Sequence, residues 1–87
     1  MRIYDNCIIT DSIHIGDTEF VLGVSTTKPG QFITWKCREK VYYDEAQYFS
    51  VLAEAQKSVV QRAQEEITRL EQLALEQTQD QVTETVL

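Results

Sequence analysis

The fold of this chain is decided by residues 44–77, DEAQYFSVLAEAQKSVVQRAQEEITRLEQLALEQ, which contain no glycine or proline and repeat apolar residues at helical spacing. A helix of that length spans ~50 Å at ~1.5 Å per residue. Residues 1–43 instead predict short strands, each reaching only ~26 Å at ~3.3 Å per residue. The helix is therefore expected to be longer than the sheet that it covers. Its far half predicts a partner, most simply a second copy of the chain.

The expected start of this helix is Asp44, whose carboxylate can accept hydrogen bonds from the free N–H groups of the first turn. Gln47 lies three residues later and completes a capping-box pattern. At about 100° per residue the apolar side chains form one band. That band consists of Phe49, Leu52, Ala53, Val59, Val60, Ala63, Ile67, Leu70 and Ala74. On the polar side, Arg62 with Glu66 and Glu65 with Arg69 are spaced as i,i+4 ion pairs.

Three strands are expected before the helix, over residues 7–15, 18–25 and 31–38. Gly16-Asp17 is a two-residue connection suited to a type II′ hairpin turn, and the turn signal of residues 28–31 separates the second strand from the third. In the first strand, Ile9, Ile13 and Ile15 share one face that Asp11 interrupts. This pattern indicates an edge strand or a β-bulge.

Val41-Tyr42-Tyr43 forms either a short fourth strand or the elbow into the helix. The sequence therefore predicts an α+β fold, in which a three- or four-stranded antiparallel β-meander packs on one long C-terminal α-helix. Residues 1–77 are expected to form a single domain. Residues 78–87 show no core-facing period and are expected to form a frayed or disordered acidic tail.

The charge of the chain is concentrated in its second half. Residues 1–43 contain five basic and five acidic side chains, whereas residues 44–87 contain three basic and nine acidic ones, so the whole net charge of −6 lies there. Direct binding to a nucleic-acid backbone requires the opposite sign. A helix that lies on a membrane surface also prefers Lys and Arg on its polar face. Neither nucleic acid nor membrane is expected as a partner.

No residue pattern indicates an enzyme, a metal site or a cofactor. Ser12 and His14 lie two residues apart on a strand, without the converging third group that a nucleophile–base pair needs. Cys7 and Cys37 do not form a close Cys-x-x-Cys pair, so metal binding is not expected. Residues 1–6 lack the apolar region of a signal peptide. A cytoplasmic location with reduced thiols is therefore expected.

Two sets of side chains are candidate contacts for a protein partner. Glu54, Glu65 and Glu76 are spaced by eleven residues and line the helix face opposite the apolar band. Such a row is either an ordinary solvated face or a mimic of a nucleic-acid backbone that competes for a basic groove. Trp35, Tyr42 and Tyr43 belong to an aromatic group that is either core packing or an exposed recognition surface.

A small ligand is an alternative at the same place, because Arg38 and Lys40 stand beside these aromatic residues and suit an anionic nucleotide.

The expected dimer interface is the apolar side of the helix. It consists of Gln56, Ala63, Ile67, Leu70 and Ala74. Gln56 either turns its amide to a strand end or faces its symmetry mate, as a polar residue in a coiled-coil seam fixes register.

Residues 15–24, IGDTEFVLGV, and residues 34–37, TWKC, resemble stretches in small uncharacterised proteins of Gram-positive bacterial prophages and conjugative elements. The resemblance implies no activity and no site residues. It implies a context in which small acidic proteins act against host defence, as CRISPR inhibitors do, by blocking a host nuclease complex. The expected function is therefore that of a non-enzymatic, dimeric interaction protein. The alternatives are sequestration of an anionic nucleotide signal and a purely structural or regulatory dimerisation module.

Overall fold

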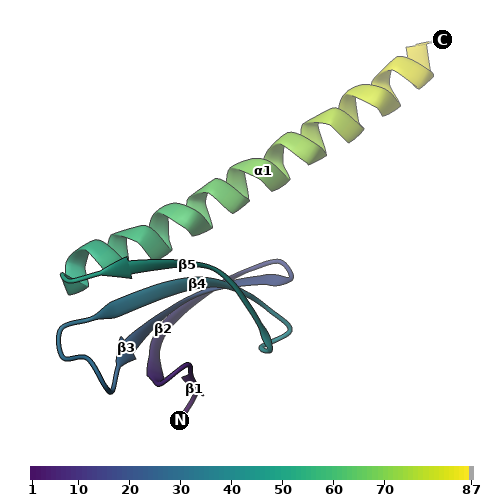
Figure 1. Cartoon of the computed structure of the whole chain (residues 1–87). Helices are drawn as coiled ribbons and strands as arrows, with labels where there is room; N and C mark the ends of the chain where they lie inside the picture. Colours follow the sequence, from purple (N-terminus) through teal and green to yellow (C-terminus); the bar gives the residue numbers. More distant parts are fainter. Residues whose placement is uncertain (87) are drawn as a thin grey trace.

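The computed structural model describes the backbone of residues 1–86 and the side chains of residues 1–77. Five strands precede a single helix, and each strand pairs antiparallel with the next, in the order β1-β2-β3-β4-β5. The elements are β1 Ile3–Tyr4, β2 Cys7–Ile15, β3 Thr18–Ser25, β4 Phe32–Arg38, β5 Tyr42–Phe49 and α1 Leu52–Val86. This is the expected α+β class, with a curled antiparallel meander and a long C-terminal helix (Figure 1).

The prediction for the start of the helix was wrong, because Asp44 and Gln47 lie in strand β5. Along β5, Gln47 pairs with Thr34 and Phe49 with Phe32, so a full strand of eight residues hydrogen-bonds to β4. Tyr and Phe favour a pleated, half-buried surface, and pairing with β4 outweighs the local capping signal. Helix α1 begins at Leu52 instead.

Strand β1 was also not expected, because it is only two residues long. It returns onto β2 through Asp5-Asn6, which have φ of 49° and 60°. Two left-handed central residues are those of a type I′ turn, and Asp and Asn are among the few residues that tolerate them. At the next turn, Gly16 has φ of 59° whereas Asp17 does not have a positive φ, in agreement with the expected type II′ turn.

A β-bulge in β2 decides which isoleucines meet the helix. The pairing of β2 with β3 shifts between Ile9 and Asp11. The extra residue moves Ile9 to the opposite face from Ile13 and Ile15, so the three do not share one face. Of the two alternatives that Asp11 indicated, an edge strand or a β-bulge, the bulge is the one observed, and the predicted common face of the three isoleucines was wrong.

The sheet buries residues on both faces. On the face covered by α1, the outer core, small helix residues allow the backbone to approach closely. This core consists of Phe20, Leu22, Ala55, Val59 and Ala63. The opposite face curls around an inner core of Cys7, Val21, Ile33, Trp35 and Cys37. Gly23 belongs to this face, where a Cβ would lie 2.9 Å from the Trp35 ring.

The inner face is closed by side chains that join the two edges of the sheet. Tyr4 on β1 stacks on Tyr43 on β5, with ring centroids 3.8 Å apart and planes 9° apart. Trp35 meets both rings edge-on, at 5.3 Å and 5.9 Å. The sheet is therefore a half-barrel whose first and last strands are connected by aromatic packing.

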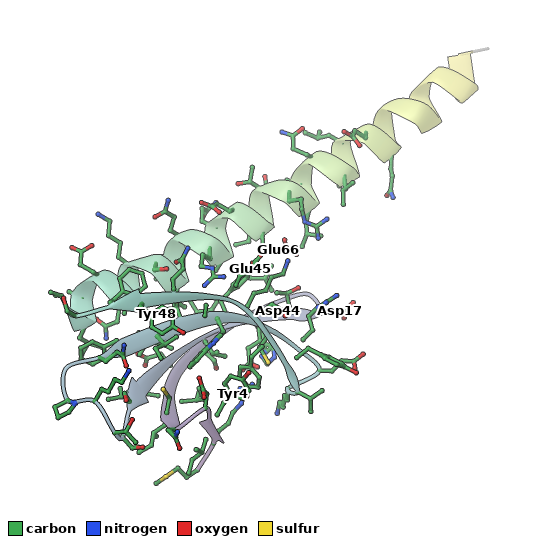
Figure 2. The ribbon with its side chains drawn as sticks, viewed as in Figure 1. Tyr4, Asp17, Asp44, Glu45, Tyr48 and Glu66 are labelled. Atoms are coloured by element: carbon green, nitrogen blue, oxygen red, sulfur yellow. The ribbon has the colours of Figure 1, made fainter. Side chains whose placement is uncertain are left out.

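Arg62 connects α1 to a second irregularity, in β5. The pairing of β4 with β5 shifts between Thr34 and Lys36, and Glu45 adopts a left-handed φ of 56° there. The Arg62 guanidinium donates to the Glu45 carbonyl at 2.8 Å and to the Thr34 hydroxyl at 3.1 Å. Figure 2 shows Glu45 and Glu66 between the sheet and the helix.

Helix α1 extends well past the sheet (Figure 1), and the molecule measures 62 × 24 × 17 Å. A Cβ on Gly16, in the β2–β3 turn, would lie 3.9 Å from Leu70 Cδ1, so the sheet reaches as far as Leu70. The apolar side of α1 therefore leaves the sheet only past Leu70. The expected frayed tail comprises residues 78–87, whose side chains lie outside the described part of the chain, so it stays a prediction. Within the described part of the chain, no helix has the length and apolar character to span a membrane.

Candidate functional site

The first candidate surface is the part of α1 from Leu70 onward, where the helix passes the end of the sheet. Leu70 and Leu73 are 38% and 43% exposed. At about 100° per residue, Leu73 lies roughly 60° from Leu70, on the side of the helix that faces the sheet further back. The face that contacts the sheet therefore continues past it as an exposed apolar stripe.

The structure separates the residues predicted for a dimer interface into two groups. Ala63 is buried in the outer core of its own chain, so its assignment to a dimer contact was wrong. Ile67 is half-buried, and Leu70 and Ala74 are exposed. Gln56 is exposed beside β2, in a shallow groove that it shares with Asp11, Ser12, Ile13, Val59 and Val60. Only the C-terminal members of the set lie on the projecting part.

Glu54, Glu65 and Glu76 are all exposed on the helix, as the row predicted from their spacing requires. The predicted i,i+4 ion pairs beside the row were wrong. Arg62 lies 3.3 Å from the Glu45 carboxylate, and Arg69 donates twice to Glu66, at 2.9 Å each. This bidentate pair lowers the pKa of Glu66 and lets its carboxylate face the sheet. Neither Arg62 nor Arg69 forms an ion pair with a glutamate of the row.

The aromatic residues predicted as a recognition surface do not form one. Trp35 is 3% exposed and fills the inner core, Tyr43 is half-buried against Tyr4, and only Tyr42 is fully exposed. Trp35 alternates inward because its neighbours Thr34 and Lys36 point to the helix side. Core packing, the alternative interpretation, accounts for Trp35. Trp35 is therefore not available to stack on a nucleotide at the predicted ligand site.

A second candidate site lies on the inner face and was missed by the sequence analysis. Arg2 donates to Glu19 Oε2 at 2.8 Å, to the Tyr43 hydroxyl at 2.8 Å and to Cys37 Sγ at 3.2 Å. Its hydrogen bond with Glu19 raises the pKa of Arg2 and lowers the pKa of Glu19 against the opposing effect of burial. Arg2 thus neutralises a carboxylate that the fold has removed from water.

Glu19 is 4% exposed, and its second oxygen, Oε1, accepts no hydrogen bond from any described residue. The Ser12 side chain also helps to lower the pKa of Glu19. One feature of the sequence could have indicated that Glu19 is buried. It is a charged residue in a strand whose next two residues, Phe20 and Val21, are apolar and point to opposite faces of the sheet.

Glu19 lies at a groove of about 650 Å³ at one end of the half-barrel. The β2–β3 turn and the β4–β5 turn form its rim. The groove is lined by His14, Gly16, Asp17, Glu19, Cys37, Arg38, Glu39 and Lys40. Its volume lies within the range of small-molecule sites, which occur often in the mouths of β-barrels.

The two cysteines of the described chain are buried thiols, and only Cys37 lines the groove. Cys37 is fully buried and in contact with Arg2, Cys7 is buried elsewhere in the inner core, and both are free thiols. Burial raises the pKa of the Cys7 thiol, which opposes formation of a thiolate. No cluster of three His, Cys, Asp or Glu side chains with metal-binding geometry occurs among the described residues.

Comparison with known proteins adds no family to this description: family models, characterised proteins and solved structures were each searched, and none matches the chain.

Proposed function

We propose that this chain is a non-enzymatic interaction protein of the cytoplasm that binds other proteins through the projecting part of α1. One observation supports the proposal: the sheet-facing stripe of α1 continues past the end of the sheet, with Leu70 exposed at that end and Leu73 exposed one turn further. Apolar side chains at this spacing are the usual contacts of paired helices. The two buried free thiols suit a reducing compartment.

The proposed occupant of this stripe is a second copy of the chain. Small domains of this size have marginal cores, and association through an apolar helix face is a common way to increase their stability. A symmetric pair would cover the same stripe on both copies at once. The row of Glu54, Glu65 and Glu76 lies on a different face and would remain available to a further partner.

The resemblance to proteins of mobile elements suggests a host nuclease complex as that further partner. A basic groove that normally holds a nucleic-acid backbone attracts a regular row of carboxylates. In this proposal the dimer presents two acidic rows, and inhibition arises because the groove is occupied. A purely structural dimerisation module would share the dimer and lack the second contact.

The test of the dimer is the change Leu73→Glu, with Leu75→Glu as matched control. Leu75 is 54% exposed but lies about 140° from Leu70 around the helix. We expect sedimentation analysis to show a dimer for the wild type and for Leu75→Glu. Leu73→Glu should be monomeric, because it places a carboxylate in a dry interface. A monomeric wild type at micromolar concentration, or equal behaviour of the two variants, would contradict the dimer.

A further inference from the structure

We infer that the open edge of β2 binds an extended segment of a partner protein as an added strand, and that this segment carries a Lys or Arg two positions from an apolar residue. The site consists of the backbone of Ser12 and His14 and of the groove beside them, which is lined by Asp11, Ile13 and Val60 among others. It is separate from the projecting part of α1 and does not depend on the dimer proposed there.

The edge of β2 is open because β1 is too short to cover it. Strand β1 pairs only with Cys7 and Ile8. One further bond follows, in which the Ile9 N–H donates to the Arg2 carbonyl at 2.9 Å. Among the residues that the structure describes, the rest of β2, residues 10–15, has β3 as its only neighbouring strand.

The turn at residues 16–17 determines which backbone groups of β2 point to this edge. In a two-residue hairpin the flanking residues, here Ile15 and Thr18, form a hydrogen-bonded pair, and such pairs alternate with non-hydrogen-bonded pairs along the ladder. Ser12 and His14 occupy the non-hydrogen-bonded positions, so their N–H and C=O groups point away from β3. These groups are available to an added strand, a mode of binding in which main-chain hydrogen bonds supply the affinity.

The other edge of the sheet, β5, is protected against such pairing. Its ladder with β4 is interrupted at Glu45, and Arg62 donates to the Glu45 carbonyl at 2.8 Å. Bulges and charged residues are common protection for edge strands. In β2 the bulge lies between Ile9 and Asp11, so a regular stretch remains from Asp11 to the turn. An added strand is therefore expected on β2.

The side chains beside the open edge select the partner. On the side of α1, Asp11 and Ile13 lie with Gln56 and Val60 in a groove of about 320 Å³. Val60 is 58% exposed, and Asp11 forms no ion pair with a described residue. An added strand places one side chain beside Ile13 and another, two positions along, beside Asp11. An apolar residue complements the first position and a cation the second.

A second copy of β2 does not meet this requirement. When two β2 strands pair antiparallel through their open backbone groups, Asp11 lies opposite an isoleucine of β2 or opposite Asp17, depending on the register. Neither supplies a cation. Asp11 therefore disfavours self-pairing of the edge and favours a basic partner.

The experiment is a titration of the isotope-labelled chain, followed by amide NMR, with short capped peptides of alternating Thr and Val. One Val is replaced by Lys, and in the matched control peptide by Glu. Both orders of Val and Lys are used, because an added strand runs parallel or antiparallel to β2. We expect shifts at the amides of Ser12, His14 and Val60, with the Lys peptide bound at least about threefold more tightly than the Glu peptide. N-methylation of the peptide residues that face β2 should abolish binding, because it removes their N–H donors.

The variant Asp11→Lys should reverse the preference, so that the Glu peptide binds more tightly than the Lys peptide. The matched control is Asp44→Lys, which makes the same change of charge at an exposed position of β5. It should keep the preference of the wild type.

The inference is overturned if the Lys peptides cause no shifts at Ser12 and His14 at millimolar concentration. Equal binding of the N-methylated peptides, or of the Lys and Glu peptides by the wild type, would overturn it as well. Shifts at the same two amides when the chain alone is concentrated would identify a second copy as the occupant and contradict a basic partner. The helix-mediated dimer is tested separately at Leu73, so failure of one proposal is distinguishable from failure of the other.

Discussion

At the scale of single residues, the pair of Arg2 and Glu19 is the interaction on which the inner face depends most. The Glu19 side chain is 6% exposed and that of Arg2 is 26% exposed, so the pair is only weakly screened by solvent. By contrast, Arg38 and Asp44 are both more than half exposed and 3.8 Å apart. Exposed pairs of that kind contribute little to stability.

The first prediction is that Arg2→Met destabilises the chain by about 2–4 kcal/mol, because it leaves the Glu19 carboxylate buried without a partner. The matched variant Arg38→Met should cost less than about 0.5 kcal/mol. Both values can be measured by urea denaturation at pH 7. A similar small cost for both variants would show that Glu19 reaches solvent in solution.

The second prediction concerns pH. Arg2 lowers the folded pKa of Glu19, so the pair contributes stability above the unfolded pKa of about 4.3 and loses it as pH falls through the folded value. In Arg2→Met the main cause of the lowering is removed, and burial is opposed only by the smaller effects of Ser12 and His14, so the pKa of Glu19 should be higher than in the wild type. The difference in stability between wild type and variant should therefore shrink steadily as the pH is lowered from 7 to about 4.

Denaturation midpoints at several pH values would measure this difference directly. The carboxylate of Glu66 also has a lowered pKa, caused by Arg69, and it contributes an acid dependence of its own. That contribution is common to wild type and variant, so it cancels in the comparison. A difference that stays constant from pH 7 to pH 4 would refute the assigned role of Arg2.

At the scale of elements, the short strand β1 closes the half-barrel. Its two residues bring Tyr4 onto Tyr43 of the last strand, and the ring edges meet Trp35 beneath them. Figure 2 shows Tyr4 on the side of the sheet away from the helix, and Tyr48 on the outer strand. The closure of the half-barrel therefore depends on β1, a strand too short to be predicted from alternating apolar and polar residues.

The third prediction is that Tyr4→Ala destabilises the chain by about 2–3 kcal/mol and shifts Trp35 fluorescence to longer wavelength, because the indole loses its cover. Tyr48→Ala is the matched control, since Tyr48 is 63% exposed. It should leave the emission maximum in place. An unchanged emission in Tyr4→Ala would mean that β1 does not cover the tryptophan.

At the scale of the whole molecule, the projecting helix separates an apolar stripe from an acidic face. Changing Glu54, Glu65 and Glu76 together to Gln keeps helix propensity almost constant, so the thermal stability should change little. If the row binds a basic groove, association should weaken at least tenfold, mainly through a slower on-rate, and wild-type binding should fall steeply with salt. Binding to proteins captured from a host lysate measures both effects.

The control for this fourth prediction carries the same change in net charge on the sheet: Asp5→Asn, Asp11→Asn and Glu39→Gln, all at exposed positions. It should bind as the wild type does. If both triple variants lose affinity equally, overall charge rather than the row controls the encounter. If neither loses affinity at low salt, mimicry of a nucleic-acid backbone is wrong.

The sequence by itself determined the class of this fold, because its strongest signals are local. The period of the apolar residues in 52–77, the Gly16 turn and the alternation along 18–25 and 31–38 depend only on near neighbours. The long helix, its overhang and the acidic row followed from the same periods. These features do not require knowledge of what any strand pairs with.

Tertiary structure decided what depends on contacts between distant residues. Residues 44–49 satisfy a helix cap locally, yet pairing with β4 makes them a strand, and a bulge turns Ile9 away from Ile13. The meeting of Arg2, Glu19 and Tyr43 joins the residue before β1 to strands β3 and β5, which are far apart in sequence. No local pattern could place Glu19 at the mouth of a half-barrel, because its burial arises only when the sheet curls and its edges meet.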